Sequence, residues 1–233
     1  MVAGMKLVLF DCDGTLVDSQ HQHIACMTAA YQAAGRPVPT RQQMLTVVGL
    51  SLPQCFDYLH GPDLRGDGPL MVEAYKDHHH DIRISGNGVG PLFDGLIPVL
   101  TWLHERDDIL LGVATGNSRK GLADVLHTHG LVDKFVVLKT ADDALSKPHP
   151  DMILQAMAET GVMRQDTVMI GDTTHDLNMA KAAEVAGIGV SYGYHHKEQL
   201  LGVAPRAVCD TAHEMGREVS SWLDERTGET SVA

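Results

Sequence analysis

The chain has 233 residues, a formal net charge of −12 and 44% hydrophobic residues. This length suits one large domain or one domain with an insertion, and the apolar share is sufficient for a packed core. The acidic charge argues against nucleic acid or an anionic membrane surface as a partner, so an anionic ligand needs a local lysine or metal ion.

The predicted elements begin with one buried strand and continue with helices. Residues 5–10 form an apolar run that leads into Asp11, as expected of a strand inside a sheet. Beyond it the apolar residues recur at helical spacing up to about residue 85, with little strand signal. Four helices are predicted in this region, at about 21–34, 40–47, 53–60 and 69–84.

The rest of the chain alternates helix and strand after a glycine-rich linker at 85–91. Such alternation predicts a mostly parallel, doubly wound α/β sheet of Rossmann-like type with helices on both faces. We therefore expect an α/β core at 1–17 and 86–233, with an inserted all-helical domain at 18–85. The predicted helices are 95–106, 119–129, 150–160, 175–185 and 211–225, and the strands are 109–114, 135–139, 167–170, 186–191 and 207–209.

Cysteine spacing and hydropathy indicate the compartment. The four cysteines are scattered and form no Cys-x-x-Cys pair, which is typical of free thiols in a reducing compartment. The apolar run before Asp11 is too short for the core of a signal peptide, and no stretch approaches the roughly 20 apolar residues of a membrane span. We expect a cytoplasmic protein without a membrane partner.

Two carboxylates follow the first strand at alternate positions, in Asp11-Cys12-Asp13-Gly14-Thr15. Like charges this close need a cation, a shared proton or full solvent. Ligands of open α/β sheets sit at the carboxyl ends of the strands, so we expect a hard cation such as Mg²⁺ held by oxygen ligands. The alternative is a surface turn, in which Asp, Gly and Thr are common. Cys12 is expected to face away from the carboxylates and into the core.

Polar residues also follow two later strands. In Thr115-Gly116-Asn117-Ser118, a hydroxyl group and backbone amides at a helix start suit a phosphoryl oxygen, although Asn117 or Ser118 could serve only as a helix cap. Asp172 ends an apolar strand and is hard to explain without a cation. Asp176 could act only in the first turn of the following helix.

Lys147 precedes a proline, and a residue before proline does not easily join a helix. Its side chain could reach into the crevice as a point charge, or it could be a solvated loop residue.

The order D-x-D-G-T, strand-ending Thr, Lys-Pro and G-D-x-x-x-D resembles the four motifs of the haloacid dehalogenase superfamily, and the resemblance covers essentially the full chain. It implies that Asp11 is the nucleophile that forms an aspartyl-phosphate and that Asp13 is the general acid/base. It further implies that Thr115 and Lys147 hold the phosphoryl group. The implied metal site takes Asp11, the Asp13 main-chain carbonyl and Asp172, with Asp176 in support.

The helical insertion resembles the mobile cap of the phosphoglycolate phosphatase and β-phosphoglucomutase branch of that superfamily. His23 resembles a histidine of its sugar-phosphate members, with a bystander role as the alternative. The loop Gly49–Leu52 interrupts the helical pattern and is expected to face the core and select the substrate. The run His78–His80 is interpreted as a solvated helix end rather than a metal site, because consecutive helical residues face different directions. The predicted substrate-binding residues are Thr115, Gly116, Asn117, Lys147, Gly49, Ser51 and His23.

These features predict a Mg²⁺-dependent phosphatase that hydrolyses a small phosphomonoester, phosphoglycolate-like or a sugar phosphate, as a monomer or homodimer. A phosphomutase using the same intermediate is the alternative, although Leu52 stands where β-phosphoglucomutases usually carry a basic residue. A dehalogenase lacks the second aspartate, whereas Asp13 is present. A non-catalytic binding module is disfavoured because every expected catalytic side chain is retained.

Overall fold

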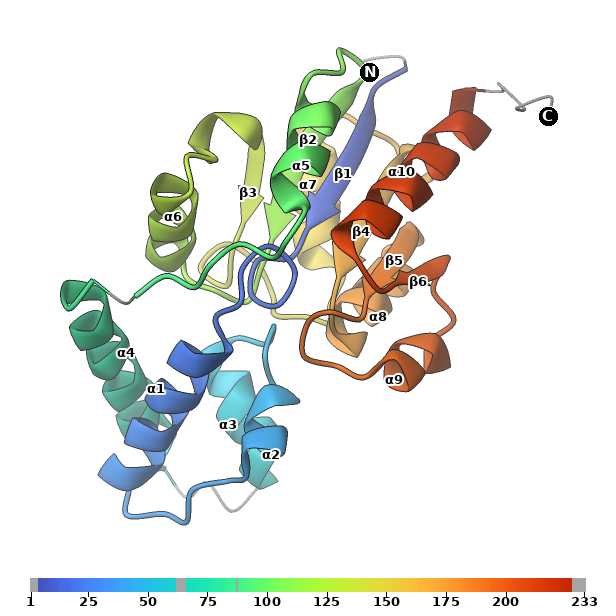
Figure 1. The fold of residues 1–233 in the computed structure, drawn as a ribbon. Coiled ribbons are helices and arrows are strands. Elements are labelled where there is room, and N and C mark those ends of the chain that lie inside the picture. The colour runs from blue at the N-terminus through green and yellow to red at the C-terminus, as the bar shows by residue number, and fades with distance from the viewer. Residues whose placement is uncertain (1–3, 62–65, 87, 228–233) are drawn as a thin grey trace.

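The computed structural model describes residues 4–61, 66–86 and 88–227. Six parallel strands form one sheet in the order β3-β2-β1-β4-β5-β6 (Figure 1), so the prediction of a doubly wound parallel sheet is confirmed. The first strand of the chain lies at the centre, between β2 and β4. The strands are β1 (Lys6–Phe10), β2 (Ile109–Ala114), β3 (Val137–Lys139), β4 (Thr167–Gly171), β5 (Ala186–Val190) and β6 (Ala207–Cys209).

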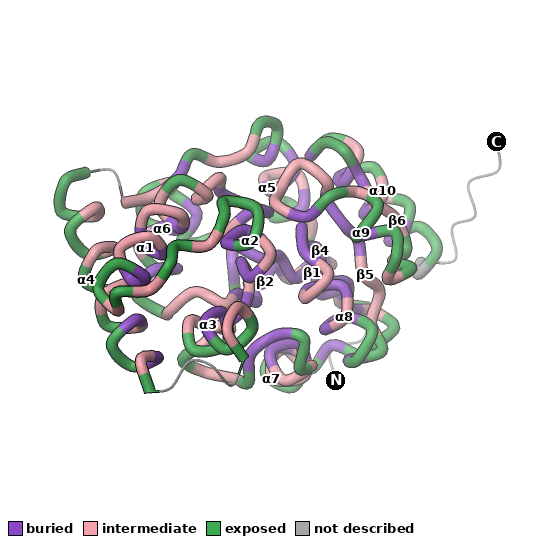
Figure 2. Tube along the Cα trace, turned by 90° about the horizontal axis from the view of Figure 1, so that it is seen from below, coloured by how far each residue is buried: buried purple, intermediate pink, exposed green. Residues whose placement is uncertain are grey.

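Helices cover both faces of the sheet, which explains why β1 is buried along its whole length (Figure 2). Successive residues of a strand point to opposite faces, so Val8 and Phe10 enter one apolar core while Leu7 and Leu9 enter the other. Residues of three helices join the first core: α5 (Leu96–His104), α6 (Arg119–Thr128) and α10 (Ala212–Thr227). Residues of two helices join the second: α7 (Asp151–Thr160) and α8 (Thr174–Ala182).

The sequence did not predict the following short elements of the described residues. The helix α9 (Lys197–Gly202) connects β5 to β6, and two 3₁₀ turns, η2 (Val132–Lys134) and η3 (Arg164–Asp166), precede β3 and β4. The β3 strand begins at Val137, two residues later than the predicted 135–139, because η2 and the two residues after it precede the strand. Among the residues described, no helix combines the length and the apolar character that a membrane crossing requires.

The other four helices form a separate group beyond the carboxyl ends of the strands (Figure 1). They have their own apolar core, which includes Met27, Tyr31, Phe56 and Met71. Thr40 caps the second of them through a hydrogen bond from the Gln43 amide, and this helix ends at Leu45, earlier than the predicted 47. These helices are α1 (Gln20–Ala33), α2 (Arg41–Leu45), α3 (Leu52–His60) and α4 (Gly68–Ile84).

The two chain segments that enter and leave the helical group run side by side. Val17 and Leu92 form an antiparallel bridge, and the amide of Asp18 donates to the carbonyl of Pro91 at 2.9 Å. A side chain at Gly90 would collide with the Asp18 main chain, so glycine is needed for this close approach. Rotation of the helical group against the sheet would therefore bend both segments at one place.

The helical group is closed against the core. The amide of Ser51 donates to Ser146 Oγ at 2.8 Å, and the His175 ring lies 3.0 Å from the Thr46 carbonyl oxygen. Gly116 follows β2 and lies so close to the Gly49 main chain that any side chain at Gly116 would collide with it. The predicted loop Gly49–Leu52 therefore faces the carboxyl edge of the sheet.

Candidate active site

The four predicted sequence motifs meet at the carboxyl edge of the sheet. Asp11 follows β1, Thr115 follows β2 and Asp172 follows β4, and these three strands are neighbours. Lys147 comes from the loop between β3 and α7. All four side chains are buried, at 1% exposure or less. The strand order explains this convergence, since neighbouring parallel strands end at the same edge.

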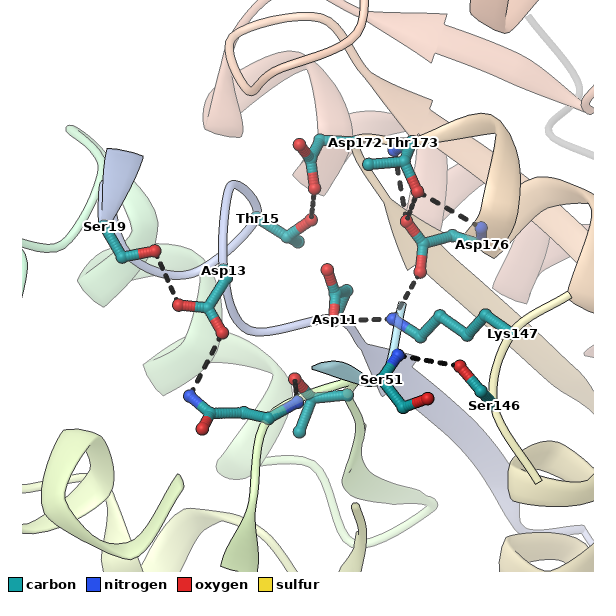
Figure 3. A network of polar contacts seen from close by, with 12 residues as sticks. Asp11, Asp13, Thr15, Ser19, Ser51, Ser146, Lys147, Asp172, Thr173 and Asp176 are labelled. Carbon is teal, nitrogen blue, oxygen red and sulfur yellow. Dashed lines mark hydrogen bonds and ion pairs between the residues drawn. The ribbon is translucent and has the colours of Figure 1, made fainter. Parts of the chain in front are cut away.

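Lys147 holds two carboxylates at once (Figure 3). Its Nζ atom donates to Asp11 Oδ1 and to Asp176 Oδ1, each at 2.6 Å, and the side chain is fully buried. Burial alone would lower the pKa of Lys147, but the Asp11 and Asp176 carboxylates outweigh it and raise that pKa above its ordinary value. Lys147 is thus a buried ammonium group, and the alternative of a solvated loop residue is wrong.

The two carboxylates held by Lys147 form a cluster with a third, that of Asp172. Oxygen atoms of Asp11, Asp172 and Asp176 lie within 4.8 Å of one another, and all three residues are buried. Asp11 Oδ2 is buried without a hydrogen-bond partner among the described residues. Burial is the main reason why the pKa of Asp11 rises from 3.8 to about 7. The Lys147 ammonium group opposes this rise, and the Asp176 carboxylate adds to it. Burial and the same neighbours raise the pKa of Asp172.

One lysine does not balance three carboxylates, so this cluster is short of positive charge. Carboxylate oxygens are the ligands that hard divalent cations prefer, and the free Asp11 Oδ2 offers an unused lone pair. The donor set of the cluster therefore fits Mg²⁺. Among the described residues it is the one group of three or more side chains with metal-ligating atoms in mutual reach.

The two later aspartates have different surroundings. Asp172 accepts one hydrogen bond on each oxygen, from Thr15 Oγ1 and from the Tyr194 amide, both at 2.9 Å. Gly14 turns the chain past Asp172 at φ +92°, and a side chain at Gly14 would collide with the Asp172 carboxylate. Glycine is required here both for the backbone conformation and for the space.

Asp176 is engaged on both sides. Its Oδ1 accepts from Lys147, while its Oδ2 accepts from the Thr173 amide at 3.1 Å and from Thr173 Oγ1 at 2.6 Å. Thr173 and Asp176 thereby form the capping box of α8, which is the first-turn role considered from the sequence. The geometry gives Asp176 a positioning role, since it orients Lys147 toward Asp11.

The Asp13 carboxylate points away from Asp11 and lies outside the cluster (Figure 3). Ser19 Oγ donates to its Oδ1 at 2.5 Å, and Asn117 Nδ2 donates to its Oδ2 at 3.1 Å. Any contribution of Asp13 to a metal site would therefore come from its main-chain carbonyl, as the resemblance implied. Cys12, between the two aspartates, is fully buried in the apolar core, as expected.

The residues after β2 combine the two roles that the sequence left open. Ser118 caps α6 by accepting from the Gly121 amide at 3.1 Å, while Thr115 Oγ1 accepts from the Asn117 amide at 3.1 Å. The Asn117 side chain does both: its Nδ2 donates to Asp13 at 3.1 Å, and its Oδ1 accepts from the amide of Ser118 at 2.8 Å, at the start of α6. The segment is therefore a helix start that also brings two polar side chains to the site.

His23 belongs to the interior of the helical group. Its ring nitrogens lie 3.1 Å from Tyr75 Oη and 3.0 Å from the Met44 carbonyl oxygen, so both have partners. Burial lowers the pKa of His23, which keeps the ring neutral at neutral pH. The structure thus accounts for His23 as a packed, hydrogen-bonded residue that also borders the cavity described next.

A cavity of about 490 Å³ separates the helical group from the core. It is bordered by α1, α3, α4, the start of α6 and the Gly49–Leu52 loop, and Asp13 lies in its wall. Within the run His78–His80, only His79 and His80 border this cavity. No described residue of the run belongs to a cluster of three or more metal-ligating side chains.

Sequence reasoning missed two residues that support the site. Ser19 holds Asp13, and its amide donates to Tyr194 Oη at 2.9 Å. Tyr194 also donates its own amide to Asp172, so it connects the carboxylate cluster to the start of α1. A signal was present, because Tyr194 follows a predicted strand at the same edge as the other motifs.

The similarity to known proteins agrees with this geometry. A family model described as haloacid dehalogenase-like hydrolase matches residues 8–190. A probable phosphatase, IndB, from Dickeya dadantii is 33% identical over 90% of this chain and 91% of its own length. A phosphoglycolate phosphatase from Vibrio parahaemolyticus is 28% identical over 91% of this chain and 94% of its own.

A crystal structure of a predicted phosphatase from Clostridium acetobutylicum has the same fold. Its TM-score is 0.81 at 24% identity, and the match covers 93% of this chain and 99% of that one. The strand order, the buried Asp11–Lys147 pair and the family match over most of the sheet lead to one assignment: this chain belongs to the haloacid dehalogenase-like hydrolase family.

Proposed function

We propose that this hydrolase is a Mg²⁺-dependent phosphatase that acts on a small phosphomonoester through an aspartyl-phosphate. The observation that carries the proposal is the state of Asp11. One of its oxygens is held by Lys147 at 2.6 Å, while the other is buried with no partner among the described residues. A carboxylate oriented in this way is a prepared nucleophile. The relatives named as phosphatases support the same reaction class.

In the first step, Asp11 Oδ2 forms a bond to phosphorus and the bond to the leaving oxygen breaks. Asp13 gives a proton to that oxygen, so the alcohol leaves neutral. Lys147 Nζ offsets the negative charge that gathers on the phosphoryl oxygens, and Thr115 with the main chain of Gly116 and Asn117 orients them. In the second step, Asp13 takes a proton from water as the water oxygen attacks phosphorus, which frees Asp11 and inorganic phosphate.

The proposed Mg²⁺ ligands are Asp11, Asp172 and the main-chain carbonyl of Asp13. Asp176 supports the site by positioning Lys147, since the Lys147 ammonium group holds its Oδ1 while only neutral donors contact Asp172. When bound, the cation supplies positive charge that lets a carboxylate approach a phosphate dianion. The shortage of positive charge among the buried carboxylates supports this assignment.

We further propose that residues 18–85 act as a cap on the core formed by 1–17 and 86–233. The cap closes over the substrate and excludes water, with Gly49, Ser51 and His23 on the side of the leaving group. The paired linkers and the close approach of the cap loop to Gly116 support this arrangement. We also propose a cytoplasmic location, which the four free and buried cysteines support. The proposed oligomeric state is a monomer or a homodimer.

The test is hydrolysis of p-nitrophenyl phosphate with Mg²⁺ and after chelation, followed by a panel of phosphomonoesters ranked by kcat/KM. Release of inorganic phosphate distinguishes a phosphatase from a phosphomutase, which transfers the group within its substrate. Mass spectrometry of the acid-quenched enzyme should detect phosphate on Asp11. Activity that survives chelation, or persists in pure Asp11→Asn protein, would contradict the proposal.

A further inference from the structure

The cavity between cap and core has basic side chains on both walls. Lys76 and Arg83 border it from α4 of the cap, and Lys120 borders it from α6 of the core. Arg83 forms an ion pair with Asp124. Lys76 and Lys120 have no ion-pair or hydrogen-bond partner among the described residues. Lys76 and Lys120 are exposed residues that border one cavity, and such a pair of unpaired lysines is notable in a chain of net charge −12.

The acidic side chains that border the cavity are, by contrast, all engaged. Asp13 accepts from Ser19 and Asn117, Asp124 pairs with Arg83, and Asp142 accepts from the Arg119 amide at 2.8 Å. None of these three carboxylates forms an ion pair with Lys76 or Lys120 among the described residues. The positive charge of these two lysines is therefore available to a ligand.

The basic face of α4 follows from helical spacing. Lys76, His79, His80 and Arg83 stand at positions i, i+3, i+4 and i+7, which brings them to one side of a helix. All four border the cavity. Burial lowers the pKa of His79, so its ring is neutral at neutral pH and offers a hydrogen-bond donor rather than a charge. The face therefore combines cations with a neutral donor, which suits a polar anion.

We propose that the leaving group of the substrate carries a second anionic group, a carboxylate or a phosphate, and that Lys76 and Lys120 bind it. The inference rests on the phosphatase function proposed above. Asp13, the proposed proton donor to the leaving oxygen, borders the same cavity as the two lysines. The rest of the leaving group would therefore occupy this cavity, where the lysines can bind it. A volume of about 490 Å³ lies within the 300–1,000 Å³ range typical of small-molecule sites.

The position of the two lysines also links anion binding to cap closure. Lys76 belongs to the cap and Lys120 to the core, and both border the same cavity, so an anion bound by both would bridge the two parts. Substrates with the second anionic group therefore stabilise the closed, water-excluding state, and substrates without it do not.

The experiment compares matched substrate pairs in wild type, Lys76→Met and Lys120→Met. One pair is 2-phosphoglycolate and 2-hydroxyethyl phosphate, which differ by a carboxylate. The other is glucose 1,6-bisphosphate and glucose 6-phosphate, which differ by a phosphate. The control is Lys181→Met, since Lys181 is exposed at the end of α8, has no described partner and does not border the cavity.

We expect wild type to prefer the anionic member of at least one pair, and each lysine variant to lower that preference in kcat/KM by about tenfold or more, the scale of a charge-assisted hydrogen bond. Lys181→Met should leave it unchanged. The pair that responds identifies the anion as carboxylate or phosphate. Absence of any anionic preference, or equal preference in wild type and both lysine variants, overturns the subsite while the phosphatase function stands.

A binding measurement separates this inference from the proposed function. Calorimetric titration of the same four compounds into the Asp11→Asn enzyme with Mg²⁺ reports affinity without turnover. If wild type hydrolyses no phosphomonoester, the proposed function fails. The subsite is then supported when anionic compounds bind at least tenfold more weakly after adding Lys76→Met or Lys120→Met, and overturned when their affinities do not change.

Discussion

Replacing Asp11 by asparagine should abolish turnover and, in the absence of metal, make the protein more stable. An amide cannot form the acyl-phosphate, so activity should disappear with the fold intact. The stability effect arises because Asp11 is fully buried beside two other carboxylates, with one oxygen unpartnered. The site is thus built for reaction at a cost in folding free energy.

The magnitude follows from the Asp11 environment. Keeping a carboxylate ionised where burial raises its pKa from 3.8 to about 7 costs about 4 kcal/mol at neutral pH. The pKa of about 7 already includes the opposing effect of the Lys147 ammonium group, so no separate amount is subtracted for that contact. The asparagine variant therefore gains up to about 4 kcal/mol, and each kcal/mol raises Tm by roughly 2–4 °C in a chain of this size.

The assay is differential scanning calorimetry at pH 7.5 with a chelator, together with p-nitrophenyl phosphate hydrolysis in Mg²⁺. Saturating Mg²⁺ should narrow the difference in Tm, because the cation stabilises wild type more than the variant. Asp13→Asn is the matched control, since the Asp13 carboxylate accepts two hydrogen bonds outside the cluster and gains nothing from losing its charge. A lower Tm for Asp11→Asn than for wild type in the chelator would refute the reasoning.

Three further outcomes are expected. Asp172→Ala should weaken Mg²⁺ affinity at least tenfold more than Asp176→Ala, because the Lys147 ammonium group already neutralises Asp176 Oδ1, whereas Asp172 accepts only from the neutral Thr15 hydroxyl and Tyr194 amide; calorimetric titration of Mg²⁺ measures this, and equal losses would contradict the ligand assignment. Gly116→Ala should lower kcat/KM by roughly tenfold or more, since its methyl group would push the cap loop away from the core. Gly202→Ala is the control, because its methyl group meets open space, and similar losses in both variants would exclude a role for the close approach. Thermal stability should decrease as the pH falls below 6.5, because burial lowers the pKa of His23 and the unfolded chain then binds more protons than the folded one. His23→Gln should reduce this slope in thermal denaturation across pH, and an unchanged slope would show that other groups cause it.

Local sequence patterns were sufficient to predict the sheet and the place of the site. The apolar runs before Asp11, Thr115 and Asp172 specify buried strands, and their polar ends specify where the strands stop. Since parallel strands end at one edge, the order of these segments already indicated that they converge. The longer predicted helices agree with the structure because their apolar spacing extends over two turns or more, whereas α2 has only five residues, Arg41–Leu45, and is shorter than the predicted 40–47. The α9 helix was missed because its six residues, Lys197–Gly202, are too short to establish a periodicity.

The contacts that define the chemistry required the folded chain. Lys147 and Asp11 are 136 residues apart in the sequence yet meet at 2.6 Å, and nothing in the spacing of either residue predicts that Lys147 also binds Asp176. Likewise, only the placement of α4 across the cavity from α6, where Arg83 pairs with Asp124, brings Lys76 and Lys120 to one cavity. The spacing of apolar residues is a local property, because backbone geometry fixes which neighbouring residues share one face of a helix or strand. The direction and pairing of a buried charge depend instead on which distant groups the packed layers leave within hydrogen-bond reach.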